Sequence, residues 1–332
     1  MSKKRVDKPD YVADEHGAVY NFLYSYKTHI TRLMTSNLLL VVFNIPMMLV
    51  AYFFSLFFLP WINSNFELSK FVDYWGDSLG ATGNANLGND ISGDDAAYQL
   101  YYMVIIFCVM FLISTSIICI GPFQAGFHQI YRNLHRQSGV FLMSDFKDGM
   151  KNNFKQSMGV MTIGIVGSSI ILFAIGFYLN GLGGGLGTAL ATFFGVSFFI
   201  FMLIQNMVYQ IMVTVDLPLR KIYRNALLFF LIKPGPCIVT ILASITLLGI
   251  IPFAMMFTSN YALMGLTVFY YLVFVIAFNQ YMIAFETGEY IDQYVTSKNP
   301  VSGDDEETFD TEDDEENEET VEEEPSSPEE NG

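Results

Sequence analysis

Six apolar segments, each about 20 residues long, constrain the fold of this chain more than any other feature. They cover approximately residues 37–59, 100–120, 158–179, 188–213, 236–257 and 262–285. A helix rises about 1.5 Å per residue, so about 20 apolar residues can cross about 30 Å of hydrocarbon. With 52% hydrophobic residues, the chain is also too apolar for an ordinary soluble domain. We predict an all-α integral membrane protein with six transmembrane helices, arranged as three hairpins.

The basic residues lie almost entirely on one side of these segments. Of the 17 Lys and Arg residues, only Lys70 falls in the connection 60–99, which follows the first segment. The others precede the first segment, occupy the connections after the second and fourth segments, or follow the sixth. Cytoplasmic loops of membrane proteins carry an excess of Lys and Arg. We therefore predict that both termini are cytoplasmic and that residues 60–99 form an outer loop.

The composition divides the chain into three parts. Residues 1–36 are predicted to be a cytoplasmic N-terminal segment with an amphipathic helix, and residues 37–285 the six-helix membrane domain. Residues 286–332 form an acidic tail, since 17 acidic and no basic side chains lie in 304–332. This tail accounts for almost all of the formal net charge of −16. A segment of this composition cannot bury enough apolar surface to fold, so we predict a disordered cytoplasmic tail.

Two cytoplasmic elbows, residues 122–157 and 214–235, combine apolar stripes at helical spacing with basic side chains. Such helices lie in the headgroup plane, where Lys and Arg reach anionic lipid. The elbows therefore either anchor the protein to a bilayer with anionic headgroups or dock another membrane component. The candidate docking residues are Arg132, Arg136, Asp145, Phe146, Lys151, Asn153, Phe154, Arg220 and Arg224.

The six apolar segments contain no Asp, Glu, Lys, Arg or His. Ion and proton carriers normally hold an ionisable group at membrane depth, so this absence counts against proton-coupled transport but not against passage of a neutral solute. The candidate intramembrane polar cluster consists of amides and one phenol: Asn44, Gln205, Asn206, Tyr209, Gln210, Asn279 and Gln280. These side chains either hydrogen-bond between helices or line a polar path. Pro46, two residues after Asn44, is expected to kink the first helix.

No enzymatic motif can be assembled on one side of the membrane. The chain has no Ser-His-Asp order, HExxH or P-loop, and its three cysteines form no CxxC pair. His128 and His135 lie on one predicted helix with Arg132 between them, which is a poor arrangement for a cation. We therefore expect no enzymatic activity, no catalytic or metal-binding residues, no cofactor and no nucleic-acid partner.

One stretch of the sequence is distinctive. It contains Gly121-Pro122, Ala125-Gly126, Arg132, Asp145-Phe146 and Asn153-Phe154-Lys155. This stretch resembles the YesL-like family of bacterial membrane proteins, which carry an uncharacterised domain, and residues 217–226 resemble the family's second cytoplasmic connection. The resemblance implies a Gram-positive plasma membrane, about six spans, and genes beside carbohydrate-uptake systems. It brings no catalytic residues, and the long acidic 60–99 loop and the acidic tail depart from the family.

These observations favour a non-enzymatic, multi-pass plasma-membrane protein. Its expected role is that of an accessory or regulatory partner of a membrane system such as a carbohydrate transporter. The alternative is a permease or channel subunit for a small neutral solute.

Overall fold

A computed structural model describes residues 18–81, 92–136, 140–257 and 261–296. This part of the chain is 92% helical and contains no strand, which confirms the all-α fold. It belongs to one compact unit, residues 1–298, whereas the second unit, residues 299–332, lies outside the described residues. The predicted disorder of the tail beyond residue 296 therefore also falls outside them.

Six helices in the described residues are long and apolar enough to cross a membrane, as predicted. They are Ile45–Ile62, Gly93–Ser114, Phe154–Leu182, Gly184–Thr214, Pro234–Met255 and Gly265–Val295. The chain is a multi-pass membrane protein by this criterion.

Three of the six spans are built from several helical pieces. The α-helices are α1 (Ala18–Phe43), α2 (Ile45–Ile62), α3 (Leu68–Ala81), α4 (Gly93–Ser114), α5 (Gly121–His135), α6 (Leu142–Asn152), α7 (Phe154–Phe177), α8 (Gly184–Thr214), α9 (Leu219–Ile232), α10 (Pro234–Ile245), α11 (Ile251–Phe257), α12 (Tyr261–Tyr270) and α13 (Ile276–Ile291). The π-helical turns are η2 (Tyr178–Leu182), η3 (Thr246–Ile250), η4 (Tyr271–Val275) and η5 (Asp292–Thr296), and the 3₁₀ turn η1 is Ser64–Phe66. The π turns continue the third, fifth and sixth spans, so each of those crosses as one bent rod.

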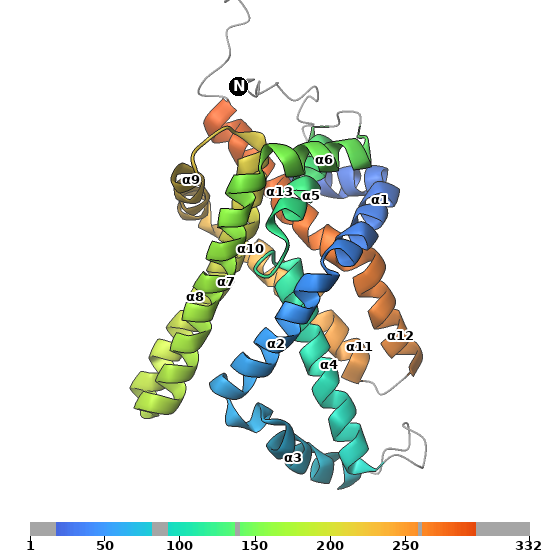
Figure 1. Ribbon diagram of the computed structural model, residues 1–332, viewed down its shortest axis with the longest axis vertical. Helices are drawn as coiled ribbons and strands as arrows, with labels where there is room; N and C mark the ends of the chain where they lie inside the picture. The colour runs from blue at the N-terminus through green and yellow to red at the C-terminus, as the bar shows by residue number, and fades with distance from the viewer. Residues whose placement is uncertain (1–17, 82–91, 137–139, 258–260, 297–332) are drawn as a thin grey trace, which may run out of the picture. The chain divides into compact units, whose positions relative to one another are not determined.

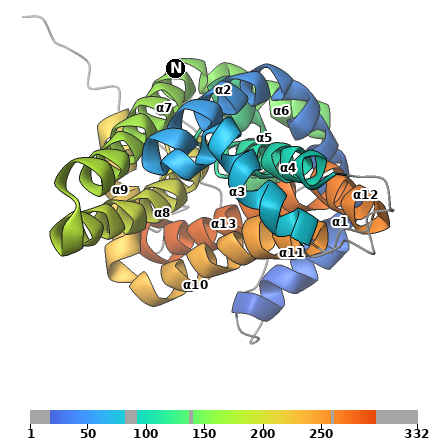
Figure 2. The same cartoon turned by 90° about the horizontal axis from the view of Figure 1, so that it is seen from below.

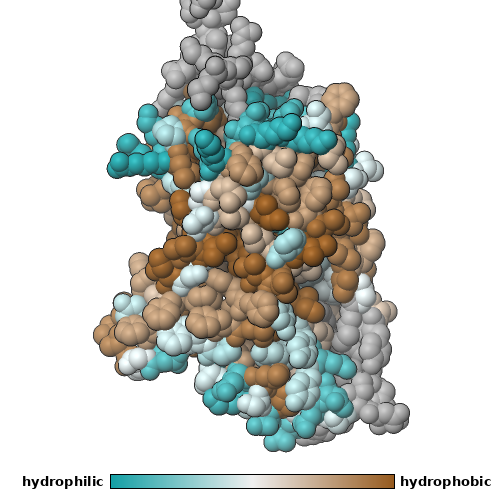
Figure 3. Space-filling model, viewed as in Figure 1, coloured by the Kyte–Doolittle hydropathy of each residue, from teal (hydrophilic) through white to brown (hydrophobic). Residues whose placement is uncertain are grey.

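The helices of this unit form a bundle (Figures 1 and 2). Helices α7 and α8 pack as an antiparallel pair along one side, and α2 packs against α4 on another. Helices α6 and α9 lie at the upper end of Figure 1, and α3 lies at the lower end. A hydrophobic belt separates hydrophilic surfaces at these two ends (Figure 3). We call the end that carries α6 and α9 the basic end.

The first two spans have different limits from the apolar segments that predict them. The first begins at Ile45 instead of residue 37, because Asn44 and Pro46 break the helix between α1 and α2. The second ends at Ser114 instead of residue 120, because the backbone leaves the helix and Ser116 adopts a left-handed φ of 55°. Hydropathy cannot locate either break, since the residues on both sides are apolar.

Two other boundaries also differ from the sequence-based expectation. The outer loop 60–99 contains α3 and the start of α4, and α3 packs on α4 through Phe71, whose ring centroid lies 5.3 Å from that of Tyr101. The sixth span continues past residue 285, where the acidic tail was predicted to begin. Tyr290 and Ile291 are buried in a hydrophobic cluster with residues of α8, α9 and α10, which stabilises this extension.

Helix α5 lies inside the protein instead of in the headgroup plane. Its apolar stripe, Phe127, Ile130, Tyr131 and Leu134, is fully buried. These residues belong to the largest hydrophobic cluster, together with residues of α1 and α13. Periodicity identifies which face of a helix is apolar, but it does not say whether lipid or protein covers that face.

Candidate functional site

Two broken helices meet in the interior of the bundle. One break lies at Asn44, between α1 and α2, and the other covers Thr115–Ile120, between α4 and α5. The Asn44 side chain joins them: its Oδ1 accepts a hydrogen bond from the Ile120 N–H at 3.0 Å, and its Nδ2 donates to the Leu40 carbonyl at 2.9 Å. Asn44 thus satisfies backbone groups at both interruptions.

The second break is held by side chains from three other helical elements. Ser116 donates its hydroxyl to Asn206 Oδ1 at 2.7 Å and accepts from Gln124 Nε2 at 2.8 Å. Asn206 Nδ2 donates to the Thr115 carbonyl at 2.8 Å, and Gln280 Nε2 donates to the Ser114 carbonyl at 3.3 Å. We call Ser114, Ser116, Gln124, Asn206 and Gln280 the polar centre. Its amides replace the helical hydrogen bonds that the unwound segment lacks.

Gln205 and Tyr209 of the predicted cluster make their contacts outside this centre. Gln205 donates to the Val160 carbonyl of α7 at 3.0 Å and accepts from the Tyr223 hydroxyl of α9 at 2.6 Å. Tyr209 contacts Cys119, with 3.4 Å between hydroxyl and sulfur. All seven predicted residues are buried, but they form separate contacts between helices instead of one continuous row.

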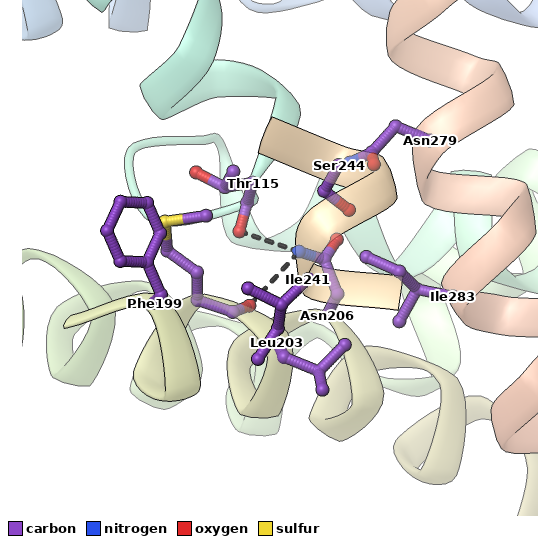
Figure 4. Close-up of a pocket in the computed structure, with 9 residues that line it drawn as sticks. Thr115, Phe199, Leu203, Asn206, Ile241, Ser244, Asn279 and Ile283 are labelled. Atoms are coloured by element: carbon purple, nitrogen blue, oxygen red, sulfur yellow. Dashed lines mark hydrogen bonds between the residues drawn. The ribbon is translucent and has the colours of Figure 1, made fainter. Parts of the chain in front are cut away.

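Asn279 differs from the other buried amides. Together with Thr115, Asn206 and Ser244 it lines a cavity of about 10 Å³, counted as the space open to the centre of a water molecule (Figure 4). Neither polar atom of Asn279, nor the Ser244 hydroxyl, finds a hydrogen-bond partner among the described residues. The cavity has room for about one water-sized group. Both polar atoms of Asn279 thus have capacity to bind a group other than the described protein residues.

His128 is another buried polar residue of α5. It donates from Nδ1 to Gln210 Oε1 at 3.1 Å and stacks on Tyr209 at 5.6 Å between ring centroids. Burial lowers the pKa of His128 to about 4, and the hydrogen bond to Gln210 only partly opposes this. The imidazole is thus neutral at physiological pH. Within the described residues, no group of three or more His, Cys, Asp or Glu side chains could hold a metal ion.

Two polar residues that hydrogen-bond between helices, Asn37 and Glu286, were not singled out from the sequence. Asn37 of α1 donates to the Tyr271 and Leu272 carbonyls, at 2.9 and 2.7 Å, and accepts from the Ala277 N–H at 2.7 Å. It thereby satisfies backbone groups that the π turn η4 frees. Glu286 lies in the sixth span and accepts from the Thr240 hydroxyl at 2.5 Å. The sequence offered only two signals. Asn37 is the first residue of the apolar segment 37–59, and Glu286 directly follows the apolar segment 262–285.

The nine candidate docking residues divide into structural and surface groups. Arg132 donates to the Val213 carbonyl at 3.1 Å, and Asp145 accepts from the Phe141 N–H at 2.9 Å at the start of α6. Arg136, Phe146 and Asn153 are buried. The exposed members are Lys151, Phe154, Arg220 and Arg224. The first pair lies at the α6–α7 junction and the second pair on α9.

Comparison with known proteins gives one match. A family model described as "Protein of unknown function, DUF624" matches residues 100–175. This region contains most of α4, the break at Thr115–Ile120, α5, α6 and most of α7, and so includes the distinctive stretch of the sequence. No curated protein and no solved structure matches the chain. The match is consistent with an uncharacterised membrane-protein family.

Proposed function

We propose that this chain is a non-enzymatic accessory or regulatory protein of a membrane system, with its basic end in the cytoplasm. One observation carries the proposal: the matched region presents an exposed, mixed basic and aromatic surface at α6. Lys147 and Lys151 are exposed on α6, and Phe141 and Phe154, which flank this helix, have exposed fractions of 75% and 53%. We call these four residues the α6 surface. The polar groups of the spans, in contrast, mainly hydrogen-bond between helices.

The composition of the α6 surface suits a protein partner. Exposed Phe side chains are enriched where proteins bind one another and mark interaction sites, whereas Lys is depleted at the centre of such contacts, so Lys147 and Lys151 would lie at the polar rim. The YesL-like resemblance suggests a plasma-membrane transporter for carbohydrates as that partner. The acidic tail is a second candidate contact for the partner.

Affinity purification after crosslinking in native membranes tests this proposal. We expect stoichiometric recovery of a membrane complex with the wild-type chain, and at least a tenfold loss with Lys147→Glu, Lys151→Glu and Phe154→Ala combined. Reversing the charge of Lys27, which is exposed on α1 before the first span, is the control for the change of charge and should preserve recovery. A chain ending at Gly303 measures the contribution of the tail. Recovery of the chain alone would refute the accessory role.

The proposed orientation has its own test. In a background in which Cys108, Cys119 and Cys237 are replaced, single cysteines are introduced as Ser78→Cys or Ser144→Cys, both at exposed positions. We expect an impermeant maleimide to label the Ser78→Cys variant in intact cells, because α3 lies at the end opposite to the basic end. The Ser144→Cys variant should react only after permeabilisation. The reverse pattern would invert the orientation.

A second candidate function, passage of a small neutral solute, is favoured by the polar centre. Broken helices that meet inside a bundle are typical of solute sites in transporters, where unwound backbone contacts the solute. Asn279 supplies an amide without a protein partner beside this break. Reconstituted vesicles should then pass a small uncharged solute such as urea or glycerol, and Asn279→Leu should abolish the flux. If the vesicles pass none of these solutes, the permease candidate is rejected and the accessory role is the one that stands.

A further inference from the structure

Helix α9 packs on the bundle through one face, and a cleft lies between α9 and α8. The cleft measures about 780 Å³ and is lined by Phe201 and Ile204 of α8 and by Arg220, Lys221, Tyr223, Arg224 and Leu227 of α9. Its deep wall is therefore apolar, whereas three cationic side chains lie along its edge. In Figure 3, hydrophilic side chains at the position of α9 lie directly above hydrophobic ones.

The sequence of α9 explains this arrangement. Ile222, Ala226 and Phe229 are buried and fix one face of the helix on the bundle. The hydrogen bond from the Tyr223 hydroxyl to Gln205 sets the distance between α9 and α8. Arg220, which lies on the remaining surface, is directed to the cleft edge together with its basic neighbours.

The three cations have no ion-pair partner among the described residues. Arg220, Lys221 and Arg224 are all exposed, and the ion pairs found in this part of the chain involve other residues. Three uncompensated cations along one cleft attract an anion, and two guanidinium groups suit the oxygens of a phosphate.

The apolar wall reaches membrane depth. Phe201 lies 13 residues before Thr214, the last residue of α8, which is about 20 Å along the helix axis. Helix α8 has 31 residues and exceeds a hydrocarbon layer of about 30 Å by about 15 Å. Even if this entire excess stood at the basic end, Phe201 would lie inside the hydrocarbon. Farther along α8, Phe193 and Val196 are exposed and continue the apolar surface.

We propose that the α8–α9 cleft is a binding site for an anionic phospholipid. The phosphate contacts Arg220, Lys221 and Arg224, and an acyl chain lies on Phe201, Ile204 and Leu227. The combination of cations at one end and an apolar wall at hydrocarbon depth matches this ligand and does not match a soluble anion or a neutral lipid. The inference requires only the multi-pass fold and is independent of the proposed accessory role.

Native mass spectrometry of the full chain in detergent tests the site, with phosphatidylglycerol and phosphatidylcholine as probes. We expect the wild-type chain to retain phosphatidylglycerol at least tenfold better than phosphatidylcholine. The variant Arg220→Gln, Lys221→Gln and Arg224→Gln should reduce this preference to less than twofold, and excess inorganic phosphate should not displace the lipid. Ile204→Gln should weaken the retention of both lipids, because it places an amide in the apolar wall.

The matched control removes the same charge elsewhere. Lys147→Gln, Lys151→Gln and Lys155→Gln neutralise three exposed basic residues at the same end, outside the cleft, and should keep the full preference. An equal loss in both triple variants would indicate diffuse surface electrostatics and would overturn the site. Equal retention of the two lipids by the wild type, or no retention, would also overturn it. Unchanged thermal unfolding of each variant shows that the loss is not misfolding.

Discussion

Replacement of Gly121 by alanine is expected to lower the stability of the membrane domain by about 3 kcal/mol, the upper part of the range for overpacking. Gly121 is the first residue of α5 and lies against the backbone of α7. A Cβ atom there would overlap the Ser157 carbonyl oxygen and lie 2.7 Å from the carbonyl carbon. Since the obstacle is backbone, relief requires one helix to move, and α5 also carries the Gln124 of the polar centre.

The measurement uses the chain's own cysteines. Cys119 and Cys237 are fully buried, so a fluorogenic maleimide should report their exposure during a temperature ramp in detergent. Gly195→Ala is the matched control, because no atom lies within 4 Å of a Cβ at that position in α8. It should leave the unfolding temperature unchanged or raise it, since alanine favours a helix interior by about 1 kcal/mol over glycine. Equal unfolding temperatures for Gly121→Ala and Gly195→Ala would refute the close packing.

A second glycine, Gly164 of α7, also lies against backbone, here that of the unwound segment Thr115–Ile120. A Cβ at Gly164 of α7 would lie 2.8 Å from the Ile117 carbonyl oxygen and 2.6 Å from Gln205 Nε2. Gly121 and Gly164 together allow the unwound segment Thr115–Ile120 to lie directly on α7. All of these residues except Gln205 fall within the region that matches the family model, so the close approach of α7 belongs to the matched unit.

The sequence predicts the six spans because length and hydropathy decide membrane crossing almost independently of tertiary contacts. It also identifies the polar residues that become buried, since an amide in an apolar segment must find partners inside the bundle. What it does not contain is the break after Ser114. The segment from 115 to 120 can leave the helix because distant spans supply hydrogen bonds there: Asn206 donates to the Thr115 carbonyl, and Gln280 donates to the carbonyl of Ser114, directly before the break.

The docking residues show the same limit. Arg132 and Arg224 have similar sequence surroundings, since Ile-Tyr-Arg-Asn occurs at both places. In the structure Arg132 binds the Val213 carbonyl from within the bundle, whereas Arg224 is exposed at the α8–α9 cleft. A four-residue pattern carries no information on which side of its helix the rest of the chain will cover.

Asn206→Leu and Asn279→Leu are expected to affect stability very differently, although both remove an amide that lines the same cavity. Asn206 makes hydrogen bonds to Ser116, the Thr115 carbonyl and the Met202 carbonyl. Its loss leaves buried groups of the break without partners, at a cost of about 1–3 kcal/mol for each buried group left unpaired. We expect Asn206→Leu to destabilise the chain by about 3 kcal/mol in total.

Asn279→Leu removes no protein hydrogen bond found among the described residues, so its stability should stay within about 1 kcal/mol of the wild type or increase. In the same maleimide assay, Asn206→Leu should therefore unfold at a lower temperature than Asn279→Leu. Equal destabilisation would show that Asn279 has a structural role, and loss of flux in Asn279→Leu vesicles could not then be assigned to the solute. If instead Asn279→Leu unfolds like the wild type, a loss of flux in this variant indicates that the Asn279 amide binds the solute. The stability difference thus decides whether this variant can separate the permease from the accessory protein.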